Sequence, residues 1–273
     1  MPEGPEIRRA ADQIAKTLVG LPAKEVYFAF ANLAPYAVDL EGQTVTAVKT
    51  YGKAMVTRFA NGLNIYSHNQ LYGRWIIRRS YDYPSTNRSL RLAIHNEKHS
   101  ALLYSASDIT VLRDEELPFH PFISRIGPDL LDEHVTIEQV AARFIDKRFQ
   151  KRRLHTILLD QSFLAGVGNY LRSEIIFVAG VHPQKRPVDC TAVQIEKLAK
   201  AALNLTRQSY KTGGITNDLE LVRKLKAQNV PRRAYRHWVF NREGQQCFTC
   251  GSAIVKDEMG SRRIYYCPNC QPT

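Results

Sequence analysis

The first apolar positions of the chain follow the repeat of an amphipathic helix. Ile7, Ala11, Ile14 and Leu18 recur at intervals of three and four residues among polar neighbours, which places them on one face of a helix. A proline two residues before Ile7 suits the first turn, and a glycine two residues after Leu18 supplies a stop. The pattern therefore predicts a helix that begins a few residues into the chain.

The next hundred residues change to the pattern of a β-sheet. β-branched and aromatic residues dominate seven short segments that polar turns separate. In order, these segments are KEVYFAF, QTVTAVKTYG, AMVTRF, LNIYSHN, RWIIRRS, RLAIHN and ALLYSAS. Residues 60–62, ANG, have the composition of a hairpin turn between the third and the fourth. The segments predict an antiparallel sandwich or barrel.

Helical patterns return after HPFISRIGPD. Capping boxes at 136–139 (TIEQ) and 191–194 (TAVQ) precede apolar helical runs. Between them, two apolar helical segments are separated by residues 165–169, AGVGN. Glycines at such a turn let backbone amides approach an anion at the start of the second helix, although an ordinary interhelical turn has the same composition. The basic, interrupted segment 211–238 predicts a partly mobile connection.

Composition limits the class of protein. A chain of 273 residues that is 44% hydrophobic can build a sizeable core and more than one domain. It contains no run of about 18 apolar residues, and its opening residues lack the apolar core of a secretory signal. We therefore expect a cytoplasmic protein that does not enter a membrane.

The net charge of +12 lies in the second part of the chain. Up to Asp146 there are 16 basic and 17 acidic residues, whereas the remainder has 22 basic and 9 acidic residues. A basic half beside a neutral half favours a polyanionic partner, with nucleic acid ahead of a membrane surface. A basic surface kept for solubility is the alternative.

Four of the five cysteines form two C-x-x-C pairs near the end of the chain. Cys247 and Cys250 are followed, sixteen residues later, by Cys267 and Cys270. This spacing is typical of a structural zinc site in which four thiolates surround one ion and leave no open position. A redox pair is the competing reading, but it needs one C-x-x-C beside a β-α-β pattern. Cys190 stands apart and receives no role.

The chain begins MPEGPE. If aminopeptidase removes Met1, Pro2 becomes a free secondary amine with a pKa of about 8, and roughly a tenth of it is neutral and nucleophilic at pH 7. An interior lysine with a pKa of about 10.4 is almost wholly protonated at that pH. Taken alone, Glu3 and Glu6 are explained as charges that complement the dipole at a helix start.

Several stretches occur together and in one order: MPEGPE, YGKA at 51–54, HNQLYG at 68–73, DQSFLAGVGNYLRSE at 160–174 and the four-cysteine module. Together they resemble the formamidopyrimidine-DNA glycosylase and endonuclease VIII family nearly end to end, and PEGPE and HNQLYG are similar to its endonuclease VIII branch. The resemblance implies an α+β protein of three domains. These are a catalytic β-sandwich with flanking helices over 1–124, a helix-two-turn-helix DNA-binding domain over 125–230, and a zinc finger on a β-hairpin over 236–273.

The resemblance also implies an activity. Such proteins are bifunctional: they excise oxidised bases from DNA and then cut the backbone at the abasic site. The expected partner is double-stranded DNA that contains oxidised bases, with pyrimidines preferred, or abasic sites. Nothing in the sequence requires an oligomer, so we expect a monomer.

The family mechanism assigns catalytic roles. Pro2 attacks C1′ of the deoxyribose, and the resulting iminium permits β- and then δ-elimination. Glu3 is placed as the proton donor that opens the sugar ring, which requires a carboxyl group of raised pKa. Lys53 resembles the lysine that serves β-elimination. Arg262, with Arg263 as the neighbouring alternative, resembles the arginine linked to δ-elimination, where a guanidinium neutralises the departing phosphate.

The remaining assignments concern DNA binding. Arg125 and Asn169 resemble the family's phosphate contacts. Gln70, Leu71 and Tyr72 fit a wedge, because base removal from a duplex requires nucleotide eversion and side chains that fill the vacancy offset its cost.

Two alternatives stay open at this point. One is the oxidised-purine glycosylase of the same family. The other is a zinc-ribbon protein that binds DNA without chemistry, and the combination of Pro2, Glu3 and Lys53 argues against it.

Overall fold

The computed structural model describes residues 2–273, so the expected removal of Met1 lies outside the described residues. The chain forms two compact units, the first ending at Arg125 and the second running from Ile126 to Thr273.

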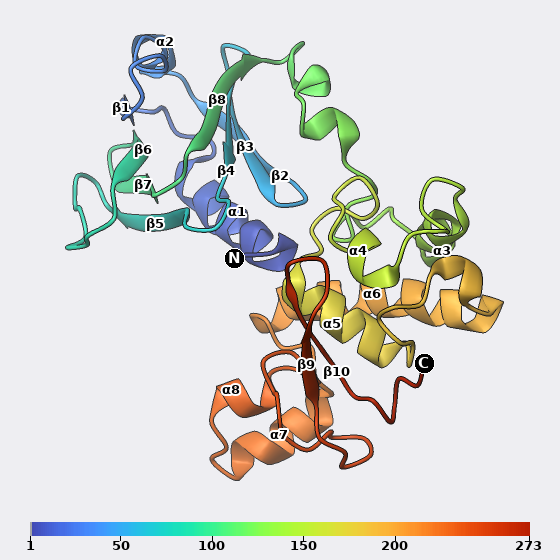
Figure 1. Ribbon diagram of the computed structural model, residues 1–273. Helices are drawn as coiled ribbons and strands as arrows, with labels where there is room; N and C mark the ends of the chain where they lie inside the picture. The colour runs from blue at the N-terminus through green and yellow to red at the C-terminus, as the bar shows by residue number, and fades with distance from the viewer. Residues whose placement is uncertain (1) are drawn as a thin grey trace. The chain divides into compact units, whose positions relative to one another are not determined.

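The first unit is a β-sandwich, coloured blue to green in Figure 1. One antiparallel sheet has the strand order β1-β6-β7-β5 and the other β2-β3-β4-β8. The strands are β1 (Glu25–Phe28), β2 (Val45–Tyr51), β3 (Ala54–Phe59), β4 (Leu63–His68), β5 (Arg74–Arg79), β6 (Leu90–His95), β7 (His99–Tyr104) and β8 (Asp108–Arg113). The helical elements are α1 (Gly4–Leu18), α2 (Tyr36–Leu40) and the short 3-10 turns η1 (Leu117–Phe119) and η2 (Ile123–Arg125).

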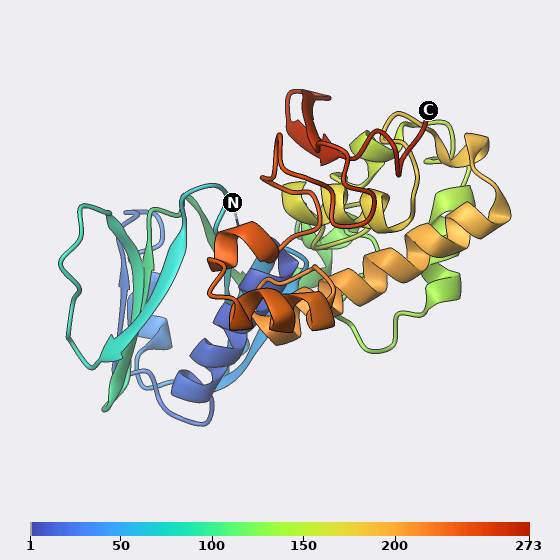
Figure 2. The ribbon, with the colours of Figure 1, turned by 90° about the horizontal axis from the view of Figure 1, so that it is seen from below.

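The apolar face predicted for the first helix enters the core of this unit. Ile7, Ala11, Ile14 and Leu18 of α1 are at most 2% exposed and belong to the same cluster as residues from both sheets. Figure 2 shows α1 lying along the sandwich. Burial of the alternating residues fixes the strand register, because a one-residue slip would turn each apolar side chain to the opposite face. The sandwich predicted from the seven strand segments is confirmed.

The sequence patterns did not predict two elements of the first unit, β8 and α2. In strand β8, DITVLR, the apolar residues Ile109 and Val111 alternate with polar neighbours, but this pattern is too short to stand out in the sequence. Helix α2 is one of the shortest helices in the described part, follows a proline as N-cap, and has a single buried residue, Leu40. A five-residue helix has too few turns to show a periodic pattern.

The second unit is helical and ends in a hairpin. Its elements are α3 (Ile137–Ile145), α4 (Leu154–Ile157), α5 (Asn169–Val178), η3 (Pro187–Asp189), α6 (Ala192–Thr212), α7 (Leu219–Ala227), α8 (Arg232–Tyr235), β9 (Val255–Glu258) and β10 (Arg263–Tyr266). Thr136 and Thr191 cap α3 and α6 as predicted, since each hydroxyl accepts the backbone N–H of the glutamine three residues later. Gly213, at a φ of 75°, ends α6.

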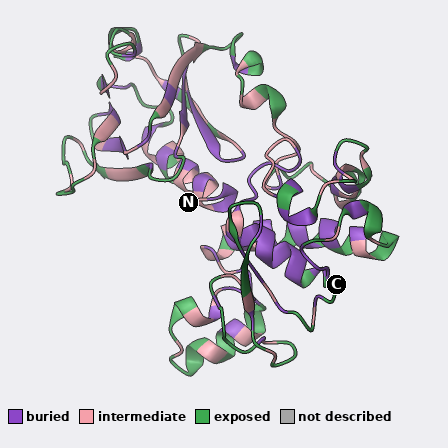
Figure 3. Cartoon of the chain, in the orientation of Figure 1, coloured by how far each residue is buried: buried purple, intermediate pink, exposed green. Residues whose placement is uncertain are grey.

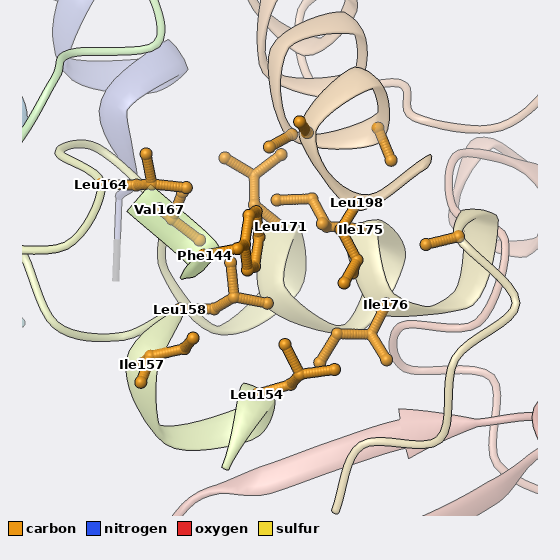
Figure 4. Close-up of a cluster of buried hydrophobic side chains, with 14 of the residues drawn as sticks. Phe144, Leu154, Ile157, Leu158, Leu164, Val167, Leu171, Ile175, Ile176 and Leu198 are labelled. Carbon is orange, nitrogen blue, oxygen red and sulfur yellow. The ribbon is translucent and has the colours of Figure 1, made fainter. Parts of the chain in front are cut away.

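Helix α5 is the centre of this unit. Residues 170–177 are all buried, and the helix is almost entirely purple in Figure 3. Leu171 and Ile175 of α5 pack with Phe144 of α3 and Leu198 of α6 in one apolar cluster (Figure 4). A helix that is buried on every side is held in place by its neighbours, so the residue at its start has a fixed position.

The prediction of a partly mobile connection over 211–238 missed two helices, α7 and α8. Asp218 caps α7 by accepting the backbone N–H groups of Glu220 and Leu221. The fully buried Asn217 donates from its side chain to the carbonyl of Tyr235 and so joins the two ends of the segment. These polar contacts have no periodic signal, so the hydrophobic pattern alone did not show them.

The predicted fold class is confirmed, with a sandwich, a helical part and a terminal hairpin that carries the four cysteines. The predicted boundary between a helical domain ending at 230 and a zinc finger beginning at 236 stays a prediction. In the described part of the chain, no helix is both long and apolar enough to cross a lipid bilayer.

Candidate active site

Helix α1 begins at the glutamate that follows Pro2. Glu3 is the N-cap residue, with an extended backbone, and its N–H donates to Oε2 of Glu6 at 3.0 Å. Its carbonyl accepts the N–H groups of Glu6 and Ile7. Glu3 is 2% exposed, whereas Pro2 is of intermediate exposure. The capping box therefore fixes the backbone on which Pro2 sits, just outside the positive end of the helix dipole.

Lys53 lies in the two-residue turn between β2 and β3, where Tyr51 pairs with Ala54. Gly52 has a φ of 59°, and a positive φ at the first turn residue belongs to the hairpin turn that suits twisted strands. Lys53 is 9% exposed, unusual for a lysine. The next residue, Ala54, pairs with His68 of β4, which places the Lys53 turn beside the end of that strand. Helix α1 packs against β2, which ends at this turn.

The predicted wedge residues form a tight loop after β4, which we name the wedge loop, residues 69–73. Gly73 N–H closes it by donating to the carbonyl of Asn69 at 2.7 Å. A Cβ on Gly73 would come within 2.5 Å of that carbonyl oxygen, so glycine is required there. Leu71 is 50% and Tyr72 67% exposed. Two large apolar side chains held in solvent by a constrained loop are available to enter another molecule.

Arg125 ends the first unit in η2 and is exposed. Its Nε donates to the carbonyl of Pro121 at 2.6 Å. The guanidinium is therefore anchored at Nε.

In the second unit, Asn169 is the first residue of α5 and follows the glycine turn 165–168. The side chain of Gln161 braces this turn: Nε2 donates to the carbonyl of Val167 at 2.9 Å, and Oε1 accepts the N–H of Gly166 at 3.1 Å. Gly166 has a φ of 91°, a conformation that favours glycine. The turn thus presents the start of a buried helix, where anions bind favourably.

Arg172 is a residue of this site that sequence reasoning missed. It is fully buried, and its Nη2 donates to Oδ1 of Asn169 at 2.7 Å and to the carbonyl of Arg263 at 2.8 Å. One buried guanidinium therefore joins the start of α5 to the β9–β10 hairpin. The side-chain oxygen of Asn169 accepts this hydrogen bond from Arg172. The NH₂ group of Asn169 is therefore the part of its amide that can donate to a phosphate. The signal in the sequence was an arginine within an otherwise apolar helical run.

The hairpin positions the two arginines differently. Arg262 lies in the turn between β9 and β10, where its carbonyl accepts the N–H of Met259 at 3.0 Å. Arg263 is the first residue of β10 and pairs with Glu258 across the hairpin. Ser173 of α5 accepts the N–H of Tyr265 at 3.3 Å, so β10 is fastened to α5. Within the second unit, the hydrogen bonds of Arg172 and Ser173 thus hold the start of α5 and the arginine-bearing hairpin together.

The four terminal cysteines converge. All four Sγ atoms lie within 4.8 Å of one another. Cys247 and Cys270 are 3.9 Å apart at sulfur, and Cys250 and Cys267 are 3.4 Å apart. A tetrahedral ion with metal–sulfur bonds of about 2.3 Å separates its ligands by about 3.8 Å, so the four sulfurs fit one metal ion. The cysteines are positioned to bind a metal, as predicted.

Glu174 is a second residue that the sequence did not reveal. It is fully buried in α5, and its carboxylate accepts the backbone N–H groups of Trp238, Val239 and Phe240 at 2.7–2.9 Å. The hydroxyl of Thr216 also donates to it. One carboxylate therefore joins α5 to the start of the cysteine-bearing segment.

Replacing Glu174 by glutamine should destabilise the second unit. The amide NH₂ cannot accept, so at least one of the buried N–H groups of residues 238–240 loses its partner, at about 1–3 kcal/mol each. Chemical denaturation should show a loss of about 2–4 kcal/mol in the free energy of unfolding. Glu196→Gln, on the surface of α6, is the matched control and should stay within about 0.5 kcal/mol of the wild type. Equal stability of the two variants would contradict this account.

Comparison with known proteins agrees with this geometry. The profile of the formamidopyrimidine-DNA glycosylase N-terminal domain matches residues 1–107, and that of the formamidopyrimidine-DNA glycosylase H2TH domain matches residues 126–220. Endonuclease 8 of Salmonella enteritidis PT4 is 45% identical over 271 residues, which cover 99% of this chain and all of that protein. The chain belongs to the formamidopyrimidine-DNA glycosylase and endonuclease 8 family. Endonuclease 8 of Salmonella typhimurium LT2 shows the same identity and coverage.

Solved structures share the fold. The Lactococcus lactis formamidopyrimidine-DNA glycosylase bound to DNA that contains an abasic site has a TM-score of 0.82 with this chain at 19% identity, over 99% of this chain and all of that one. The same L. lactis enzyme, in complex with DNA that contains an oxidised pyrimidine, also reaches 0.82 at 18% identity, over the full length of both chains. The predicted family is confirmed, and with it the prediction of a base-excision repair enzyme that is a DNA glycosylase and abasic-site lyase.

Proposed function

We propose that this protein removes oxidised pyrimidines from double-stranded DNA and then cuts the abasic site by β,δ-elimination, with the amine of Pro2 as the nucleophile. The observation that carries the proposal is the start of α1. There a proline of intermediate exposure precedes a buried glutamate, and a capping box orders the backbone. The preference for pyrimidines rests on the similarity to endonuclease 8.

The chemistry at Pro2 follows from its secondary amine. The nitrogen lone pair attacks C1′, the bond from C1′ to the base breaks, and the departing base takes up a proton. Loss of the ring oxygen from C1′ leaves an iminium, which withdraws electrons and acidifies the C2′ proton. Removal of that proton expels the 3′ phosphate, and a second elimination expels the 5′ phosphate. Hydrolysis of the iminium then regenerates the amine.

Glu3 and Lys53 supply the proton transfers in this proposal. Glu3 is 2% exposed and directly follows Pro2, so its carboxyl group is held beside the nucleophile, where it can pass a proton to the ring oxygen. A lysine that is 9% exposed is held by its turn rather than extended into solvent, so its ammonium can pair with a phosphate or serve the elimination at a fixed position.

In the second unit we assign phosphate binding to Asn169 and to Arg262, with Arg125 of the first unit as a further contact. Arg262 is preferred to Arg263 because it lies in the hairpin turn, whereas Arg263 belongs to strand β10 and pairs there with Glu258. Arg262 is exposed in the hairpin turn, where a guanidinium can meet a leaving phosphate.

We assign the metal at the four cysteines to zinc, as the four-thiolate set and tetrahedral spacing favour it. When bound, the ion supplies folding energy rather than chemistry, because four cysteine ligands leave no coordination position for substrate. Gln271 helps to build the second knuckle: its Oε1 accepts the N–H of Cys267, and its Nε2 donates to the carbonyl of Val181.

Truncating the wedge should separate base excision from strand cutting. In the double variant Leu71→Ala, Tyr72→Ala, excision of thymine glycol from a duplex should fall about tenfold to a hundredfold, because eversion costs a few kcal/mol and the vacancy is left unfilled. Cutting of a preformed abasic site should fall much less, because that nucleotide has no base to unpair.

The control for the wedge variant is Phe119→Ala, which removes an equally apolar side chain that is 82% exposed. Single-turnover rates on both substrates measure the effect. Equal losses on the duplex lesion and on the abasic site would contradict the wedge role.

One experiment tests the proposed function as a whole. Duplexes that contain thymine glycol, 8-oxoguanine or an abasic site are incubated with the wild-type protein, and both released bases and strand products are measured. We expect release of thymine glycol ahead of 8-oxoguanine, and cuts that leave phosphate at both ends of the gap. A reversed order would favour the purine glycosylase. DNA that is bound but left uncut would favour a protein that only binds.

A further inference from the structure

The wedge loop is tied to a histidine of the neighbouring strand. Nδ1 of His68, the last residue of β4, accepts the backbone N–H of Gln70 at 3.1 Å. A backbone amide can only donate, so Nδ1 must carry no proton. His68 is therefore neutral when this bond is made, with its proton on Nε2.

The bond holds a backbone conformation that the chain would otherwise avoid. Gln70 has a φ of 48°, in the left-handed region, which costs a residue with a side chain about 1 kcal/mol or more. The side chain of Gln70 is also held, because the hydroxyl of Ser107 donates to its Oε1 at 2.7 Å. At the far side of the loop, Arg88 donates to the carbonyl of Tyr72 at 2.6 Å. These bonds hold the backbone on both sides of Leu71.

The surroundings of His68 set its protonation. Its strand places it opposite Ala54 in β3 and opposite Asp108 in β8, and the ring of Phe122 lies 5.5 Å away between centroids. The charges that act on it are Lys53 from the β2–β3 turn and Asp108 from β8. Burial lowers the pKa of His68 most, Asp108 raises it and Lys53 lowers it.

Two further titratable groups belong to the same surroundings. Tyr66, two residues earlier in β4, packs against His120 with ring centroids 4.0 Å apart and the rings tilted by 36°, and Asp108 acts on the pKa of both groups. Burial lowers the pKa of His120 and raises that of Tyr66. Both groups are therefore neutral at pH 7, and neither adds charge beside His68.

We propose that His68 is a positioning residue, whose unprotonated Nδ1 locks the wedge loop in the shape that inserts into DNA and whose protonation releases it. The proposal rests on the wedge role given to the loop under the proposed function. The hydrogen bond from Gln70 N–H to His68 is fully formed above the pKa of His68 and is lost as pH falls through that pKa. Since that pKa is lowered, the lock holds at neutral pH and opens in acid.

Two substitutions distinguish the role of Nδ1 of His68 from that of Nε2. In His68→Asn, the side-chain Oδ1 takes the place of Nδ1 as an acceptor for Gln70 N–H and does not titrate. In His68→Gln, the amide reaches the position of Nε2 and leaves Gln70 N–H without this acceptor. The two variants are similar in polarity and differ in which ring atom they replace.

The readout is the fluorescence of 2-aminopurine placed opposite thymine glycol in a duplex, which reports wedge insertion in single-turnover mixing. At pH 7.5, His68→Gln should slow insertion about threefold to tenfold, the equivalent of one lost hydrogen bond. His68→Asn should restore most of the rate. Between pH 7.5 and 5, wild-type insertion should slow, whereas insertion by His68→Asn should change less. Cutting of a preformed abasic site by each variant measures the chemistry separately.

The outcomes are distinguishable. If His68→Gln keeps the wild-type rate and His68→Asn loses it, Nε2 is the working atom and the proposal is overturned. If both variants match the wild type, the bond to Gln70 has no role in insertion and the proposal is also overturned. Failure of the wild type itself to release thymine glycol or to cut abasic DNA would instead contradict the proposed function.

Discussion

Adding one residue before Pro2 should abolish the covalent chemistry of this protein. An added residue turns the proline nitrogen into an amide whose lone pair is delocalised into the peptide bond, so it cannot attack C1′. We expect trapping by borohydride and cutting of abasic DNA to fall at least about a thousandfold, the usual scale for losing a nucleophile. Retention of Met1 should have the same effect. DNA binding should remain, because the phosphate contacts are elsewhere in the chain.

The matched control is Pro5→Ala. Pro5 lies within the first turn of α1, where it favours the helix start but leaves the terminal amine untouched. This variant should trap and cut DNA within a few-fold of the wild type. If the extended chain also traps at the wild-type rate, the nucleophile is not at the amino terminus.

Removal of the metal should have the second-largest effect. The hairpin that carries Arg262 joins a small cluster that includes Val239, Ile254 and Tyr265, and two of the cysteines are part of that cluster. So few apolar residues cannot fold a module by themselves, and zinc ligation in small modules contributes on the order of 10–16 kcal/mol. A chelator, or Cys267→Ser, should therefore unfold the hairpin and remove Arg262 from its position.

We expect this loss to reduce DNA affinity and to leave any residual cutting stalled after β-elimination. The first unit should stay folded, since its core is separate from that of the second. Cys190→Ser, which changes a cysteine outside the cluster, should retain full metal content and activity. Elemental analysis should give one zinc ion per wild-type chain and much less in Cys267→Ser. Full activity in a metal-free chain would contradict this role.

The sequence predicted much of the fold because its signals are local. The helical spacing of Ile7 to Leu18, the two threonine capping boxes and the seven strand segments each depend on neighbours a few residues apart. The cysteine spacing was equally informative, because two knuckles that bind one ion require little else of the chain.

The contacts that position the site were not predictable in the same way. Arg172 bridges residues more than 90 positions apart in the chain, and Glu174 reaches the segment 238–240 from the middle of α5. His68 acts on Gln70 only because β4 ends where the wedge loop begins. Each is a polar side chain whose partners are set by tertiary packing, and single-sequence periodicity contains no information on such partners.

The most direct test of the mechanism is to locate the covalent bond. The processed protein is incubated with duplex DNA that contains thymine glycol, reduced with borohydride and digested, and the crosslinked peptide is sequenced by mass spectrometry. We predict that the deoxyribose remnant is attached to the nitrogen of Pro2. Attachment to Lys53, or to any other lysine, would contradict the account.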